Sequence, residues 1–263
     1  MNAVQPPPDF QTARQSEKRS LYPLPKDGFV STPLTQEQRN ALGIDAYYRP
    51  YRLNSDVLKA SAHYASTVKR LMDILLSLVG ILFLWPLMLV FMLAVVLEDP
   101  KGSPLFMQER IGKNGKPFKM YKLRSMYTDA EERLPEMMEQ NEAQLKAFKI
   151  KKDPRITRVG AIARKFSIDE LFQLINILKA DMSIVGPRPP LAREVSQYDE
   201  YDLQRLAIRP GLTCYWQVYP HRHEISFEDW VAMDLKYLNS RSLKTDVELI
   251  LRTFLTIFSG NGD

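Results

Sequence analysis

The chain has few of the residues that build disulfides or zinc sites. Among its 263 residues there is one cysteine, Cys214, and three histidines, His63, His221 and His223. A lone thiol excludes an intrachain disulfide, and these side chains lack the paired spacing of a zinc site. The sequence also lacks a GxxxxGK[ST] loop, a GxGxxG turn and a nucleophile-elbow serine. Common nucleotide cradles are therefore excluded, and a nucleotide would have to be held in another way.

The sequence also lacks a strong charge bias. Lys and Arg number 36 against 31 Asp and Glu, which gives a formal net charge of +5. This balance suits an anionic partner, such as a phosphorylated ligand, an acidic membrane surface or a nucleic acid, without choosing among them. No basic module with interleaved aromatic residues is present, which argues against nucleic acid as a partner.

Residues 1–60 have no persistent helical or strand periodicity. Seven of the 18 prolines lie before position 51, including the run Pro6 to Pro8. We expect a flexible or partly extended, Pro-rich cytoplasmic tail. The alternative is a segment through which the chain docks on a partner, or on a second copy of itself.

One long segment carries no charge at all. The 24 residues from Ile74 to Leu97 are almost entirely apolar. As a helix they would extend about 36 Å, enough to cross a hydrocarbon core of about 30 Å. They begin too far from the N-terminus to be a cleaved signal peptide. Pro86 lies at the midpoint, where its ring removes a backbone hydrogen bond and bends a helix.

The charges that flank this segment indicate its topology. Lys69 and Arg70 precede it, which predicts a cytoplasmic start. The region after it is basic again, from Arg110 to Lys122. Basic residues on both sides favour a re-entrant helix over a spanning one, although proline-kinked spanning helices also occur. We therefore expect a tail at 1–60, a membrane-associated re-entrant helix at 61–101 and a cytoplasmic domain at 102–263.

The fold class predicted for the last part is α+β, mainly helical with a short β-hairpin. Asn114 and Gly115 suit the positive φ angles of a two-residue hairpin loop. In the strand that follows, alternation places Lys122 and Arg124 on one face. Helices are expected near 128–147, 167–179, 191–205, 226–238 and 246–258.

An adjacent acidic pair, Asp169 and Glu170, follows Ser167. Ser167 and Glu170 have capping-box spacing and an apolar helical face follows, so the local pattern by itself favours a helix cap. The same helix start would also attract phosphate and keep Asp169 ionised as a nucleophile. Two adjacent carboxylates could further hold Mg²⁺.

Two proline-rich turns carry cations. Prolines on both sides of Arg188 restrict its backbone, and a guanidinium suits bidentate phosphate binding. Arg209 to Thr213 forms a second such turn. Either arginine alone could equally be a surface residue.

With these residues in view, the chain resembles the bacterial sugar transferase family, the monotopic polyprenyl-phosphate phosphoglycosyl transferases. The similarity runs from about Lys69 to Gly260. It rests on seven ordered blocks, which begin at Lys69, Gln108, Tyr121, Asp153, Ser167, Asp181 and Arg209.

The resemblance implies an Mg²⁺-dependent catalytic domain at 102–263. Asp169 would attack the β-phosphate of a UDP-sugar, expel UMP and form a phosphosugar–aspartyl intermediate. Undecaprenyl phosphate would then take the sugar phosphate, in the first membrane step of exopolysaccharide, capsule, O-antigen or other glycoconjugate synthesis. Glu170 would assist with the metal or a proton.

The same resemblance makes Arg188 a phosphate ligand and assigns further basic or polar site positions to Lys122, Arg124, Arg164, Arg209 and Thr213. It also implies a membrane helix that is broken at Pro86, re-enters, and keeps the catalytic domain on the cytoplasmic face of the bacterial inner membrane.

Phe172 and Cys214 depart from the family, which usually has Pro and Gly there, so the sugar cannot be chosen by analogy. The competing hypothesis is a non-catalytic membrane scaffold or regulator of a polysaccharide system.

Overall fold

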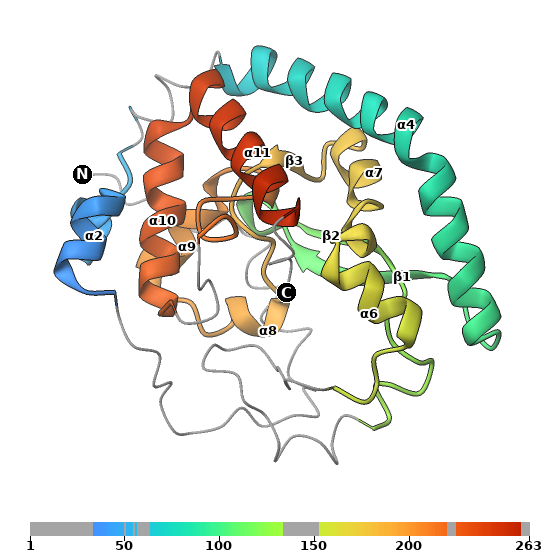
Figure 1. The fold of residues 1–263 in the computed structure, drawn as a ribbon. Helices are drawn as coiled ribbons and strands as arrows, with labels where there is room; N and C mark the ends of the chain where they lie inside the picture. Colours follow the sequence, from blue (N-terminus) through green and yellow to red (C-terminus); the bar gives the residue numbers. More distant parts are fainter. Residues whose placement is uncertain are drawn as a thin grey trace.

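The computed structural model describes residues 34–49, 51–54, 56, 64–133, 153–219 and 225–258. These residues form a mixed, mainly helical fold with a short antiparallel hairpin, which confirms the predicted class (Figure 1). His63, His221, His223 and most of the helix predicted at 128–147 lie outside them. Residues 128–133 form turns, so the expected helix does not begin at Thr128.

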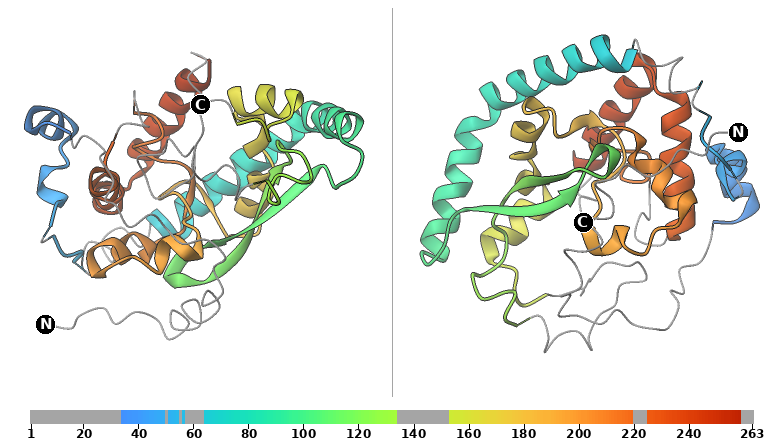
Figure 2. Two further views of the ribbon diagram at one scale, coloured as in Figure 1. Left: turned by 90° about the horizontal axis from the view of Figure 1, so that it is seen from below. Right: turned by 180° about the vertical axis from the view of Figure 1, so that it is seen from behind.

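The elements follow one another along the chain, and Figure 2 shows them from two further sides. The helices are α2 (Gln36–Leu42), α4 (Lys69–Glu98), α6 (Arg158–Lys165), α7 (Gln173–Leu178), α8 (Ala192–Val195), α9 (Glu200–Leu203), α10 (Phe227–Ser240) and α11 (Leu243–Phe258). The strands are β1 (Leu105–Ile111), β2 (Pro117–Leu123), β3 (Ser183–Val185) and β4 (Gly211–Thr213). Short turns of 3₁₀ helix include η1 (Asp45–Tyr47), η3 (Lys113–Gly115), η5 (Ile168–Glu170) and η6 (Gln204–Ala207).

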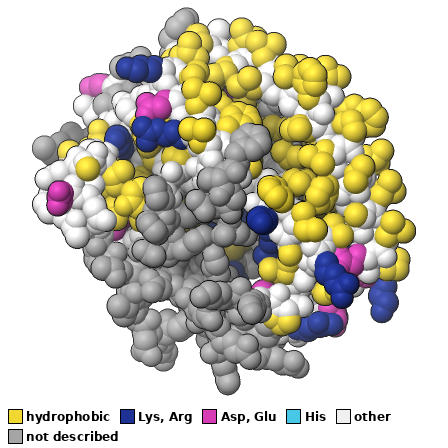
Figure 3. Space-filling view, in the orientation of Figure 1, with side chains coloured by type: hydrophobic (Ala, Val, Ile, Leu, Met, Phe, Trp, Pro, Cys, Tyr) yellow, Lys and Arg dark blue, Asp and Glu magenta, His cyan; other side chains and the backbone are white. Residues whose placement is uncertain are grey.

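The long apolar helix α4 curves around one side of the molecule (Figure 1). Its outer face is open, with Phe83 and Leu97 74% and 83% exposed, and Figure 3 shows hydrophobic side chains gathered over it. Within the described ranges it is the one helix long and apolar enough to cross a membrane, and its most apolar 18 residues have a mean hydropathy of 2.7. Pro86 lies inside this helix. Its role as the point of kinking and re-entry stays a prediction.

The N-terminal end of α4 is bonded to the globular part through charged side chains. Lys69 forms a buried ion pair with Asp246 of α11. One turn later, Asp73 accepts hydrogen bonds of 3.0 Å from both the Ser183 hydroxyl and the Ile184 amide of β3. These contacts hold the start of the apolar helix against α11 and β3.

The C-terminal end of α4 is bonded to the same globular part. Glu98 accepts hydrogen bonds from the free amides of Arg158 and Val159, at 2.7 and 2.9 Å, and so caps α6. Asp99 forms an ion pair of 2.9 Å with Arg124, just beyond β2. Both ends of the apolar helix are therefore held by one folded unit.

The hairpin forms where the sequence predicts it. β1 and β2 pair from Leu105↔Leu123 to Ile111↔Pro117. Asn114 and Gly115 have φ angles of 57° and 77°, which confirms the left-handed turn. The loop nevertheless has three residues, the η3 turn, instead of the two expected, because the Gly112 amide bonds the Lys116 carbonyl.

A second, parallel pair of strands was not predicted. β3 and β4 run side by side and pack with α10 and α11 around the main core. The two strands approach so closely that a Cβ at Gly211 would lie 2.1 Å from the Gly186 nitrogen. Glycine is required there because of this contact between backbones. The helices predicted at 226–238 and 246–258 are confirmed as α10 and α11.

The helix predicted at 191–205 is broken into α8, α9 and η6. The break occurs because the Asp199 side chain accepts hydrogen bonds from the amides of Tyr201 and Asp202, and so starts a new helix.

Residues 34–54 differ from the expected tail where they are described. The segment folds into α2 and η1 and packs along α10 (Figure 1). Leu34 and Ile44 are buried with Trp230 and Met233. Residues 1–33 lie outside the described part, and the boundary near residue 60 stays a prediction.

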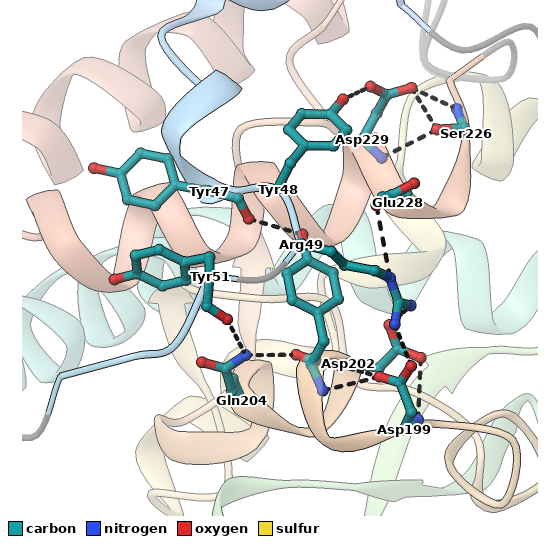
Figure 4. A network of polar contacts seen from close by, with 11 residues as sticks. Tyr47, Tyr48, Arg49, Tyr51, Asp199, Asp202, Gln204, Ser226, Glu228 and Asp229 are labelled. Atoms are coloured by element: carbon teal, nitrogen blue, oxygen red, sulfur yellow. Dashed lines mark hydrogen bonds and ion pairs between the residues drawn. The ribbon is translucent and has the colours of Figure 1, made fainter.

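Polar contacts reinforce this packing of residues 34–54 (Figure 4). The Tyr48 hydroxyl donates to Asp229, and Arg49 pairs with Asp199 and Asp202. Amino-acid composition does not predict contacts of this kind. Proline content alone suggests an unfolded tail.

Candidate active site

The acidic pair lies on η5, a single 3₁₀ turn between α6 and α7. Ser167 has φ 54° and ψ 25°, a left-handed conformation, and its side chain makes no capping hydrogen bond. The predicted capping box is therefore wrong, and the helix predicted at 167–179 is confirmed only over α7. A left-handed serine costs on the order of 1 kcal/mol. This left-handed residue turns the chain two positions before Asp169.

Apolar residues on either side of the pair fix this turn. Ile168 and Phe172 are buried with Leu123 of β2 and with Met88 and Val95 of α4. The chain between them can move little, because its flanks are part of the core. Asp169 is itself 7% exposed. The structure thus places the acidic pair where the hairpin meets the apolar helix.

Glu170 forms an ion pair with Lys122, another predicted site residue. The Lys122 ammonium donates a hydrogen bond of 2.9 Å to Glu170 Oε1. Both side chains are about one quarter exposed, at 24% and 27%, so the pair remains accessible to a ligand. An accessible ion pair therefore connects β2 and η5 at the site.

A second cation near Glu170 was not selected as a site residue. Arg110 of β1 is buried, and its guanidinium donates to the Pro189 carbonyl at 3.0 Å. Burial and the nearby Arg188 lower the pKa of Arg110 to about 9, while the charge of Glu170 acts in the opposite direction. Arg110 lies in the family block that begins at Gln108, but the sequence gave this block no separate role in the site. The signal lies across the chain, in its contact with the loop that carries Arg188.

Arg188 is held from two sides. Its guanidinium lies 3.6 Å from the Glu194 carboxylate and 5.4 Å from the centre of the Trp230 ring. The same ring contacts the guanidinium of Arg205 at 5.1 Å. Arg205 also forms a fully buried ion pair with Asp234 and donates to the Arg188 carbonyl at 3.4 Å. These partners restrict the orientation of Arg188.

Lys122 contacts Glu170, and the charges of Glu170 and Arg188 both act on the unpredicted Arg110, so these residues and the neighbouring Asp169 belong to one charged region. Two buried or half-buried guanidinium groups near each other repel, and a bound anion would relieve that repulsion. This basic cluster beside an acidic pair has the charges expected of a phosphate site.

Other predicted site residues have different partners. Arg124 is buried against Asp99 and anchors the end of α4, because β2 ends at Leu123 and the expected alternation ends with it. Arg164 donates to the Ser125 hydroxyl at 2.8 Å. Burial, together with the charges of Arg209 and Arg241, lowers the pKa of Lys113. Arg209 follows η6, which packs against the hairpin turn η3.

Thr213, the last residue of β4, lies beside a groove next to η5. Its hydroxyl is 2.6 Å from that of Thr253 on α11. The space in and above the groove, including open solvent, is about 500 Å³. It is lined by Ser167, Glu170, Leu171, Leu212, Gln217, Thr253, Thr256 and Ile257.

The two departures from the family pattern point into cores. Phe172 is 3% exposed, and Cys214 is 1% exposed. Burial raises the pKa of the Cys214 thiol, so the thiol stays protonated. Neither side chain lines the groove.

The acidic pair is compatible with a magnesium ion. Within the described ranges, no group of three or more His, Cys, Asp and Glu side chains converges. Mg²⁺ does not need such a group, because it keeps several waters and takes one or two carboxylates. Asp169 and Glu170 supply two adjacent carboxylates, so the available donors fit the ion.

Comparison with known proteins identifies the family of this chain. The Bacterial sugar transferase family model matches residues 64–260. The exopolysaccharide production protein ExoY of Rhizobium meliloti is 38% identical over 198 residues, which cover 74% of this chain and 87% of ExoY. The galactosyl transferase CpsE of Streptococcus agalactiae is 38% identical over 194 residues, 74% of this chain and 43% of CpsE.

The undecaprenyl-phosphate galactose phosphotransferase of Salmonella typhimurium is 35% identical over 216 residues, which cover 80% of this chain and 44% of that protein. The chain thus spans under half the length of CpsE and of the Salmonella protein. The family match nevertheless includes the apolar helix, the hairpin, the acidic pair and the Arg188 loop. The chain therefore belongs to the bacterial sugar transferase family.

Proposed function

We propose that the protein is a phosphoglycosyl transferase, which moves a sugar 1-phosphate from a UDP-sugar to undecaprenyl phosphate and releases UMP. The observation that carries this proposal is the acidic pair beside the Lys122, Arg110 and Arg188 cluster. The name of the Salmonella relative, an undecaprenyl-phosphate galactose phosphotransferase, supports a polyprenyl phosphate acceptor. The name of ExoY supports a role in exopolysaccharide synthesis.

In the proposed reaction Asp169 is the nucleophile. One of its carboxylate oxygens bonds to the β-phosphorus of the UDP-sugar, and the bond from that phosphorus to the bridging oxygen breaks. UMP leaves with the electron pair of the broken bond. A phosphate oxygen of undecaprenyl phosphate then attacks the same phosphorus, which returns Asp169 as a free carboxylate. The product is a polyprenyl diphosphate sugar.

The cations would bind and orient the phosphates during both displacements. Arg188 has a planar fork of donors and is held by Glu194 and Trp230. Arg110 donates a hydrogen bond to the Pro189 carbonyl, in the loop that carries Arg188. Lys122 fixes the Glu170 carboxylate, which favours Asp169 as the attacking group and leaves Glu170 to assist. Mg²⁺, held by Asp169 and Glu170, would offset the repulsion between a carboxylate and an anionic phosphate.

The same proposal places the protein at the bacterial inner membrane with α4 as a re-entrant helix. Its support is that Lys69 and Asp99, at opposite ends of α4, both pair with the folded part that carries the acidic pair. A straight crossing would put these ends on opposite sides of a core about 30 Å thick. Nucleotide-sugars are cytoplasmic, so a hairpin keeps donor, acceptor headgroup and Asp169 on one face.

Cysteine labelling in sealed inner-membrane vesicles tests this topology. Val68→Cys and Ser103→Cys flank α4 at accessible positions, whereas a side chain at Gly102 would contact Thr128 at 2.6 Å. Both cysteines should react with an impermeant maleimide only from the cytoplasmic side. The buried Cys214 should give little background and serves as the control. Labelling of the two positions from opposite sides would replace the hairpin with a span.

The activity itself is tested with detergent-solubilised protein, Mg²⁺, undecaprenyl phosphate and a panel of UDP-sugars. We expect UMP and a lipid diphosphate sugar to appear in equal amounts with one or a few sugars. Removal of divalent cations with EDTA should stop the reaction, and added Mg²⁺ should restore it. If no UDP-sugar in the panel yields UMP, the proposed function is wrong.

A further inference from the structure

The groove beside η5 differs in chemistry from the charged cluster next to it. It is bounded by η5, β4 and α11, and Ser167 and Glu170 lie at its end nearest the acidic pair. Its walls are almost entirely apolar atoms, although several lining residues are formally polar. The structure thus has two adjoining surfaces, one cationic and one apolar, that meet at Glu170.

Hydrogen bonds within α11 explain the apolar walls. The Thr253 hydroxyl donates to the Leu249 carbonyl at 2.7 Å, and the Thr256 hydroxyl to the Arg252 carbonyl at 3.0 Å. Both bonds join residues one turn apart on the same helix. Because the hydroxyl groups bond within the helix, the threonines offer their methyl groups to the groove. Leu171, Leu212 and Ile257 complete the apolar lining.

The walls of the groove are apolar, and apolar area exposed to water is unfavourable by about 25 cal/mol per Å². A nucleotide or sugar would not remove this cost, because its hydroxyls and base would lose hydrogen bonds against apolar walls. A hydrocarbon chain would remove it.

We infer that this groove binds the phosphate-proximal isoprenoid units of the lipid phosphate acceptor. The inference rests on the proposed function and locates the acceptor within the same site. The acceptor phosphate would lie at the Glu170 end, near Lys122, while the chain follows α11 outward.

Filling the groove tests the inference through the two half-reactions. Thr256→Phe and Ile257→Phe each add bulk to the α11 wall, and Val247→Phe adds the same ring to an exposed position nearer the start of that helix. The burst of UMP on mixing enzyme with UDP-sugar and Mg²⁺, without lipid, reports the first half-reaction. Steady-state turnover with undecaprenyl phosphate and with farnesyl phosphate reports the second.

We expect both filled variants to keep a UMP burst within about twofold of the unmodified protein. Their KM for undecaprenyl phosphate should rise about tenfold, equivalent to about 1.4 kcal/mol of lost binding. Val247→Phe should change neither quantity. The burst also shows that each variant is folded with a working acidic pair.

Three results would overturn the inference, and they can be told apart. A normal burst with an unchanged KM for both lipid phosphates in both filled variants would mean that the acceptor binds elsewhere. No burst and no turnover in the unmodified protein, with any UDP-sugar, would overturn the proposed function and the groove assignment with it. Loss of the burst in both filled variants alone would make the groove part of the donor site, which also contradicts the inference.

Discussion

Asp169→Asn is expected to lower the rate of UMP release by at least about a thousandfold, in line with removal of a nucleophile in other covalent enzymes. The Asp and Asn side chains are nearly identical in size, so the substitution removes the negative charge but keeps the shape of the side chain. An amide cannot form the phosphosugar–aspartyl bond, because it lacks an anionic oxygen. Single-turnover assays with the accepted UDP-sugar measure the loss directly.

Glu170→Gln separates the roles of the two carboxylates. Glu170 already accepts a hydrogen bond from Lys122, so its loss should weaken substrate or metal binding without removing the nucleophile. We expect the rate of UMP release to fall about ten- to a hundredfold. A labelled phosphosugar should still attach to the protein. In Asp169→Asn the covalent label should be absent. A labelled Asp169→Asn protein would move the nucleophile to Glu170.

Asp181→Asn is a matched control, because Asp181 is another partly exposed carboxylate close to α7. It accepts a hydrogen bond of 3.2 Å from Asn176 and lies 3.8 Å from the Lys179 ammonium. Loss of this surface pair should cost at most about 1 kcal/mol of stability and little activity. Circular dichroism on all three variants separates a chemical defect from unfolding.

Local sequence patterns predicted those parts of the fold in which neighbouring residues determine the structure. Asn114 and Gly115 set the left-handed hairpin turn, and charge-free residues made α4 evident. The pattern at Ser167 failed because a serine that could cap a helix instead adopts a left-handed turn. Packing of Ile168 and Phe172 into the core outweighs that local preference.

The remaining features depend on residues far apart in sequence. The family resemblance assigned Arg124 to the site, whereas in the structure Arg124 forms an ion pair with Asp99 at the end of α4. Arg110 was overlooked because its contact with Pro189 crosses 79 positions of the chain. Residues 34–54 were taken for a tail because proline content reports a local property, whereas Ile44 is buried by contact with α10.

Arg205→Met should destabilise the protein by about 3–5 kcal/mol, because it leaves the buried Asp234 without its cation. The two side chains are 1% and 2% exposed, so water cannot take the place of the lost partner. Chemical denaturation in a fixed detergent measures this cost. Arg252→Met is the matched control, since that arginine forms an exposed pair with Glu248. It should change stability by no more than about 1 kcal/mol.

The double variant Arg205→Met, Asp234→Leu distinguishes a structural from a positioning role. Replacement of both charges by apolar side chains should restore most of the lost stability, because no unpaired charge remains buried. It should not restore the hydrogen bond to the Arg188 carbonyl or the contact with the Trp230 ring. We therefore expect a KM for the UDP-sugar about tenfold higher at near-normal stability, because Arg188 is less well oriented. Recovery of both stability and KM would reduce the ion pair to a purely structural element, whereas recovery of stability alone identifies Arg205 as the residue that positions Arg188.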